Sequence, residues 1–169
     1  QTKAATLAIA EHSGPVYLRF GRPKVPNFTA INQEFKIGKG IRLIEGKDVT
    51  IVATGHLVWE AIECVTKLKS EGIFAELINI HTIKPLDSKL ILKSLSKTKC
   101  IVSAEEHNII GGLGESISRI LVQEKLVPME FVGVNDSFGE SGKPSDLMKK
   151  YQLSCDNIYE KCKIAISRK

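Results

Sequence analysis

The sequence predicts an α/β fold, a three-layer α/β/α domain built around a mainly parallel sheet of about five strands. Two observations indicate this class. From Asp48 onward, short continuous apolar runs alternate with longer stretches whose apolar residues recur at helical spacing. The chain has 169 residues, of which 43% are hydrophobic and 25% charged, so its composition is that of a globular domain with a sizeable core.

The apolar runs are the predicted strands. They lie at Val49–Thr54, Ala75–Ile80, Cys100–Ala104 and Met129–Val134. Because runs without polar alternation are typical of strands buried on both faces, we expect these segments to be neighbours in one parallel sheet with right-handed crossovers. A further strand is expected within Phe35–Leu43 at an edge of the sheet, where an antiparallel direction is open.

Helices are predicted between the runs. The helix over Leu57–Lys69 ends before Gly72, a residue typical of a helix stop. Pro85 and Asp87 open the next helix, which runs through Leu95. Further helices are expected from the glycine cluster at 111–114 to Glu124, over Pro144–Tyr151 and over Asp156–Ser167.

The first third of the chain has a different pattern. A helix through His12 and a strand over Pro15–Phe20 precede a stretch with several prolines and few periodic apolar residues, which predicts a linker. We therefore divide the chain into the end of one domain (residues 1–24), a linker (25–35) and a complete domain (36–169). Because Gln1 already lies inside a predicted helix, we expect the sequence to be the C-terminal piece of a longer polypeptide.

Charge and cysteine content exclude several classes of function. The net charge is +5, but the basic residues are scattered and not interleaved with aromatic ones, so no nucleic-acid partner is expected. No apolar run approaches the roughly 20 residues of a membrane-spanning helix, so no membrane partner is expected. The cysteines form no C-x-x-C pair or zinc spacing, and Cys64 and Cys100 fall in apolar segments. We expect a reducing, cytoplasmic location and no metal site.

Candidate site residues follow the predicted strands. In "GPVYLRFGRP", Arg22 lies just past a strand end, where ligands of α/β sheets gather, and Arg19 precedes it. A guanidinium can bind phosphate through two hydrogen bonds, but spacing alone leaves a surface ion pair equally open. His81 follows the second buried strand at the same edge, where a structural role is the alternative to a functional one.

The stretch "SAEEHNIIGGLGE" places a glycine cluster between a strand and a helix. Such glycines can bind a phosphate at the helix N-terminus. Here, however, the cluster follows the third strand rather than the first, and Glu105 and Glu106, with His107 next to them, would repel a pyrophosphate. The sequence favours a tight turn with close helix–sheet packing, and a phosphate site is the alternative.

Several of these blocks, in this order, resemble the C-terminal part of transketolases. They are "GPVYLRFGRP", "EFKIGKG", "GKDVTIVATGHLVWEAIE", "INIHTIKPLD", "SAEEHNIIGGLGE" and "GVNDSFGESGKPSDLMKKYQL". Deoxyxylulose-phosphate synthase and the beta subunit of pyruvate dehydrogenase share "IKPLD" and the acid–glycine block more loosely. By this resemblance, the first domain is the end of a pyrimidine-binding domain and the last is a transketolase C-terminal domain.

The resemblance implies an enzyme that transfers a two-carbon ketol unit between sugar phosphates. It further implies thiamine diphosphate and a divalent cation, magnesium or calcium, in the parent enzyme, together with a homodimer or a partner subunit. The family's G-D-G…N metal segment and its activating glutamate are absent from this sequence. We therefore expect this fragment alone to be inactive, without a catalytic residue, a bound cofactor or a metal.

For the site residues, the resemblance places Arg22 at the family's phosphate-binding arginine and Arg19 at the earlier arginine of that block. His81 stands where deoxyxylulose-phosphate synthases carry an arginine, and with His107 it forms a possible minor site. The resemblance also indicates that the glycine cluster is a turn. The alternatives are a deoxyxylulose-phosphate synthase, a relative of the 2-oxo acid dehydrogenase beta subunit, and a non-catalytic assembly or regulatory module.

Overall fold

The computed structural model describes residues 1–21, 24–30 and 33–169. Its centre is a sheet of five strands in the order β1-β3-β2-β4-β5. The strands are β1 (Ile41–Ile44), β2 (Val49–Ala53), β3 (Ala75–Asn79), β4 (Ile101–Asn108) and β5 (Met129–Val134). All neighbouring pairs are parallel except β1 and β3, which are antiparallel. The predicted α/β class and the antiparallel edge strand are confirmed.

The central strands are buried because they are apolar on both faces. Every residue of β2 and of β3 is buried. Their polar exceptions have partners: the Thr50 hydroxyl lies 2.6 Å from the hydroxyls of Ser94 and Thr98. Similarly, Glu76 in β3 forms an ion pair with Lys97 and lies 3.6 Å from the Arg42 guanidinium. These contacts offset the cost of burying a hydroxyl and a carboxylate in the sheet.

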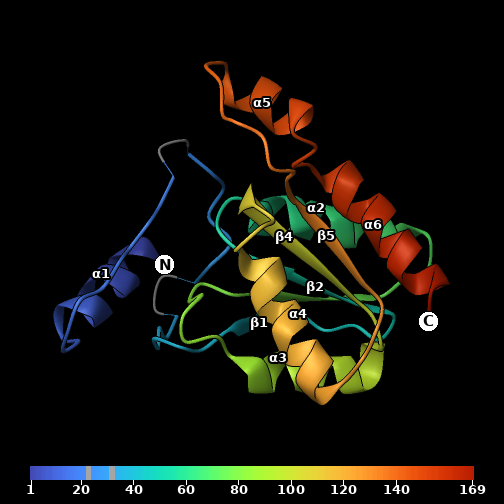
Figure 1. The fold of residues 1–169 in the computed structure, drawn as a ribbon, viewed down its shortest axis with the longest axis horizontal. Helices are drawn as coiled ribbons and strands as arrows, with labels where there is room; N and C mark the ends of the chain where they lie inside the picture. The colour runs from blue at the N-terminus through green and yellow to red at the C-terminus, as the bar shows by residue number, and fades with distance from the viewer. Residues whose placement is uncertain (22–23, 31–32) are drawn as a thin grey trace.

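Helices cover both faces of the sheet (Figure 1). On one face, α2 (Leu57–Ser70) and α6 (Cys155–Ser167) close an apolar core over β2 and β4. On the other face, α3 (Ser88–Thr98) and α4 (Leu113–Glu124) close a second core. The molecule therefore has the predicted three-layer arrangement. The short helix α5 (Pro144–Lys150) buries no residue and stands away from the sheet.

The start of α3 ties the segment before β1 to the body of the fold. Asp87 accepts a hydrogen bond from the backbone N–H of Leu90 (3.2 Å) with one carboxylate oxygen, which caps the helix. Its other oxygen accepts from the backbone N–H of Gly40 at 3.1 Å. The prediction that Asp87 opens this helix is thus confirmed in its detail.

The first third of the chain agrees with the sequence only in its helix. Helix α1 spans Thr2–Ala10. The strand predicted over Pro15–Phe20 is wrong, because this segment forms no strand in the described part of the chain. Its apolar residues are exposed, Tyr17 by 87% and Phe20 by 65%. An alternating apolar pattern becomes a strand only where another strand offers hydrogen bonds, and no described strand pairs with it.

No described helix combines the length and the apolar character needed to cross a membrane.

Candidate functional site

The order of the strands creates a topological switch point between β2 and β4. From β2 the chain passes through α2 on one face to β3, whereas from β4 it passes through α4 on the opposite face to β5. The carboxyl ends of two such adjacent strands enclose the crevice where open α/β sheets bind ligands. In this chain the crevice contains side chains from β4, from the start of α2 and from the N-terminal segment.

Glu105 occupies the position that an anionic ligand would take at the start of α4. It is 3% exposed, and its two carboxylate oxygens accept hydrogen bonds from the backbone N–H groups of Leu113 (2.7 Å) and Gly114 (2.8 Å). A helix N-terminus attracts anions through these same groups. Burial raises the pKa of Glu105, and the two backbone hydrogen bonds oppose that rise. The protein's own carboxylate therefore fills the phosphate position.

The glycines of the cluster allow this close packing. A Cβ atom at Gly112 would lie 2.3 Å from a Glu105 carboxylate oxygen, and one at Gly114 would lie 2.4 Å from the Phe131 ring. The structure supports the packing role that the sequence favoured for the cluster. It corrects the strand end, however: β4 continues through Glu105, Glu106 and His107 to Asn108, four residues beyond the predicted end at Ala104.

A second contact at the switch point joins three parts of the chain. The Nδ1 atom of His56, the residue before α2, lies 3.0 Å from an oxygen of Glu106 in β4. On the other side of the imidazole, a Cβ atom at Gly21 would lie 2.3 Å from Cε1 and from Nε2. The backbone at Gly21 therefore packs directly on the ring. We call His56 and Glu106 the switch-point pair.

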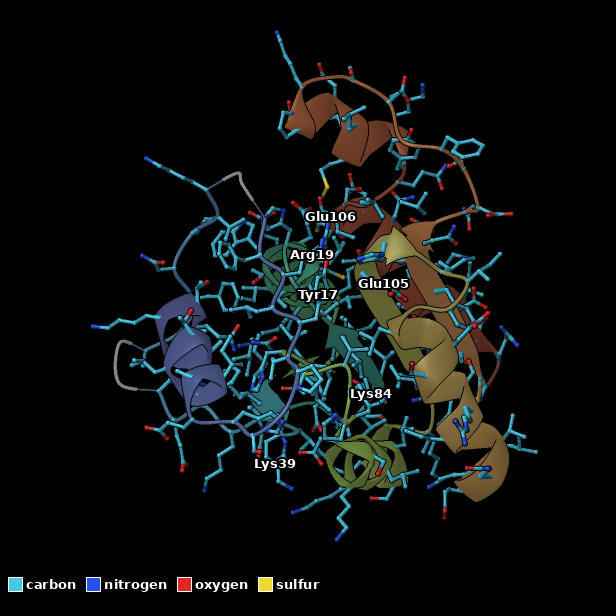
Figure 2. The ribbon with its side chains drawn as sticks, turned by 60° about the vertical axis from the view of Figure 1, so that its left-hand side comes forward. Tyr17, Arg19, Lys39, Lys84, Glu105 and Glu106 are labelled. Carbon is cyan, nitrogen blue, oxygen red and sulfur yellow. The ribbon has the colours of Figure 1, made fainter. Side chains whose placement is uncertain are left out.

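The arginine segment lies close to this pair. Figure 2 shows Tyr17 and Arg19 on the stretch that leads toward the end of β4, where Glu105 and Glu106 are labelled. Arg19 is exposed and forms no ion pair with any other described residue. Arg22 lies outside the described residues. The structure thus brings Gly21, between the two arginines, to the carboxyl edge of the sheet, and phosphate binding by either arginine stays a prediction.

His81 follows β3 at the same edge, as predicted. Its ring stacks on Phe35 with centroids 4.2 Å apart, and its Nδ1 lies 3.0 Å from the Thr82 hydroxyl. Its Nε2 is buried and has no hydrogen-bond partner among the described residues. Burial lowers the pKa of His81, so the imidazole is neutral at pH 7. His107, by contrast, is exposed in β4, and β2 lies between the two strands, so the structure does not bring these histidines together.

The residues of this chain do not fit a diphosphate cofactor with its cation. Glu105 fills the anion position at the glycine cluster. Among the described residues, no three histidine, cysteine or carboxylate side chains come together as metal ligands. The four cysteines are free thiols. They are also unsuited to nucleophilic chemistry, since burial raises the pKa of Cys100 to about 11 and that of Cys155 to about 11.

The switch-point pair was not predicted from the sequence. A signal for it exists, because His56 follows one predicted strand through Gly55 and Glu106 follows another. Bringing them together requires the strand order, in which β2 and β4 are neighbours although β3 separates them in sequence. Strand order is set by the packing of the crossover helices, which the local pattern does not specify.

Known proteins share this sequence and this fold. The family model of the transketolase C-terminal domain matches residues 38–158. The "6-deoxy-6-sulfo-D-fructose transketolase subunit SqwH" of Clostridium sp. (strain MSTE9) is 42% identical over 158 residues, which are 94% of this chain and 49% of that protein. One of the two subunits of an apulose-4-phosphate transketolase from Phocaeicola vulgatus is 33% identical over 167 residues, 98% of this chain and 52% of that protein.

Among solved structures, a split-gene transketolase described as an inactive β4 tetramer matches with a TM-score of 0.93 and 42% identity. That match covers 98% of this chain and 56% of the other. The chain thus spans about half the length of the curated relatives it matches.

Proposed function

Because the chain belongs to the transketolase C-terminal domain family, we propose that it is the C-terminal part of a thiamine diphosphate-dependent transketolase. The full protein would transfer a two-carbon ketol unit from a ketose phosphate to an aldose phosphate. Thiamine diphosphate, bound with magnesium or calcium, supplies the electron sink for such a transfer. Since the residues of this chain do not fit the cofactor, we assign its binding to the rest of the protein, and we expect the chain alone to be inactive.

The proposal extends to the domain division. Residues 1–24 would be the end of a pyrimidine-binding domain, 25–35 a linker, and 36–169 the C-terminal domain. The exposed apolar side chains of the first part support this division: Leu7, Val16, Tyr17 and Phe20 are all large and exposed. Exposed apolar patches of this kind mark surfaces that another unit covers. The covering unit would be the remainder of the transketolase or a partner subunit, in a homodimer or a larger assembly.

The observation that carries the proposal for substrate binding is the contact of Gly21 with His56 at the carboxyl edge of the sheet. Arg19 and Arg22 flank this glycine in sequence, and we propose that they bind the anionic end of the sugar. The names of the two relatives specify a sulfo group in one case and a phosphate in the other. Both groups present oxygen atoms that a guanidinium can bind through two hydrogen bonds.

The test uses the full-length protein with any partner subunit, loaded with thiamine diphosphate and Mg²⁺. Fructose 6-phosphate and 6-deoxy-6-sulfofructose serve as donors, with glyceraldehyde 3-phosphate as the acceptor. The proposal predicts transfer of the ketol unit from at least one donor. Release of CO₂ from pyruvate without ketol transfer would instead indicate a deoxyxylulose-phosphate synthase. Turnover in neither assay would favour the non-catalytic assembly module.

A further inference from the structure

The imidazole of His56 is held between two parts of the chain that are far apart in sequence. Its Nδ1 lies 3.0 Å from a Glu106 carboxylate oxygen. Its opposite edge, formed by Cε1 and Nε2, faces the Cα of Gly21 so closely that a Cβ there would lie 2.3 Å from both atoms. One ring therefore connects β4 with the segment before residue 22.

Both members of the switch-point pair stand on rigid elements. His56 immediately precedes α2, whose first residues Leu57 and Val58 are buried in the core. Glu106 follows Glu105, which is fixed to the start of α4 by its two hydrogen bonds. The side chains of His56 and Glu106 are only 15% and 34% exposed. The position of the ring is thus set by the packed domain.

The segment that the ring contacts has little structure of its own. Residues 15–20 form no helix or strand, and of these only Leu18 is half-buried. Arg19 lies in this segment, two residues before the contact. A long cationic side chain on such a backbone points in one direction only if the backbone is held nearby.

We propose that the switch-point pair is a seat for Gly21, and that His56 and Glu106 are positioning residues for the anionic end of the sugar donor. The pair does not touch the substrate. It fixes the backbone that presents Arg19, and a glycine is required because any side chain at position 21 would displace the backbone from the ring. This inference rests on the proposed function, in which Arg19 contributes to anion binding.

The first test is kinetic and uses the full-length protein with its partner and cofactor. Gly21→Ala is expected to raise the KM for fructose 6-phosphate by roughly ten- to a hundred-fold, the effect of misplacing a binding group by about 1 Å. The KM for fructose, which carries no anion, stays unchanged. The matched control is Gly139→Ala, because a Cβ at Gly139 meets no atom within 4 Å.

A double-mutant cycle then ties the effect to the ring. His56→Ala alone raises the KM for fructose 6-phosphate, because the seat is gone. In that background, Gly21→Ala adds little, since the atoms that its Cβ would strike are absent. Glu106→Gln, which keeps an acceptor for the imidazole N–H, retains more of the affinity than Glu106→Leu does. Independent, additive effects of Gly21→Ala and His56→Ala would overturn the seat.

Arg19→Ala separates failure of the seat from failure of the proposed function. If Arg19→Ala raises the KM for fructose 6-phosphate while Gly21→Ala does not, the seat is wrong and the phosphate role of Arg19 survives. If both variants leave that KM unchanged, the phosphate role fails, and the positioning role of the seat fails with it. A nuclear Overhauser effect between the Gly21 Hα and His56 Hε1 protons, lost in Glu106→Leu, supports the seat, and its absence in the wild-type protein refutes it.

Discussion

At the scale of single residues, Glu105 decides what the carboxyl edge of the sheet can bind. A carboxylate buried without partners would be costly, but two backbone N–H groups of α4 offset much of its desolvation. The same interaction removes the helix N-terminus from the set of free anion sites. The substrate anion must therefore be bound by cationic side chains, and the arginine segment supplies them.

The buried Glu105 also predicts a pH effect on stability. Burial raises the pKa of Glu105 above its usual value of 4.5. The folded state then binds this proton more tightly than the unfolded state. The contribution of Glu105 to the free energy of unfolding is therefore full below pH 4.5 and decreases as the pH rises through the folded pKa. Glu105→Gln cannot ionise, so it removes this decrease.

Urea unfolding of the chain at a series of pH values measures the effect. We expect the stability of Glu105→Gln relative to the wild type to increase as the pH rises above 4.5. The matched control is Glu63→Gln, on the exposed face of α2, which keeps the wild-type pH dependence. Parallel stability curves for Glu105→Gln and the wild type would show that Glu105 ionises equally readily in both states.

At the scale of elements, the fit of α4 on the sheet depends on a missing side chain. The first turn of α4 contacts β5 at Gly114, where a Cβ would lie 2.4 Å from Cδ1 of Phe131 and 2.8 Å from the Ser103 hydroxyl oxygen. Helix and strand could accommodate that atom only by moving apart, which would also stretch the hydrogen bonds to Glu105. Packing and capping are therefore coupled at this junction.

Gly114→Ala is accordingly expected to lower the free energy of unfolding by about 1–3 kcal/mol, the usual cost of overpacking a core. Phe131→Leu in the same chain should recover part of this loss by making room for the added methyl group. Gly139→Ala, at an open position, serves as the control. The measurement is equilibrium urea unfolding, and a Gly114→Ala protein as stable as the wild type would contradict the close packing.

The success of the sequence analysis also varies by element. The four apolar runs became β2, β3, β4 and β5 because burial on both faces leaves a local signal that needs no tertiary information. The end of β4 was missed because Glu105, Glu106 and His107 are polar, although Glu105 is buried against α4. The strand over Pro15–Phe20 was wrong because its pattern requires a partner strand that the described chain does not contain.

The candidate site was predictable to the extent that strand direction determines it. Parallel strands end at one edge, so His81 and the two carboxylates of β4 were expected there. The contact of His56 with Glu106 depends on strand order, and the approach of Gly21 depends on the path of a segment without regular structure. Neither quantity has a local signal, and both follow from packing over the whole domain.

At the scale of the whole molecule, the work of a transketolase is divided between parts. This chain belongs to the C-terminal domain family, and its own side chains fill the crevice where α/β sheets bind ligands. Its proposed contribution is to hold the anionic end of the sugar, while the rest of the protein holds the cofactor. The central claim is therefore one of specificity: the arginine segment recognises the charge on the donor.

The most direct test compares kcat/KM for fructose 6-phosphate with kcat/KM for fructose, in the full-length wild-type protein and in Arg22→Ala. Loss of a hydrogen bond to a charged group corresponds to roughly 1.5–3 kcal/mol, so the ratio should fall about ten- to a hundred-fold. The melting temperature should not change, because the effect is on the ligand. Equal losses of kcat/KM on both donors, or a loss that follows a lower melting temperature, would contradict the claim.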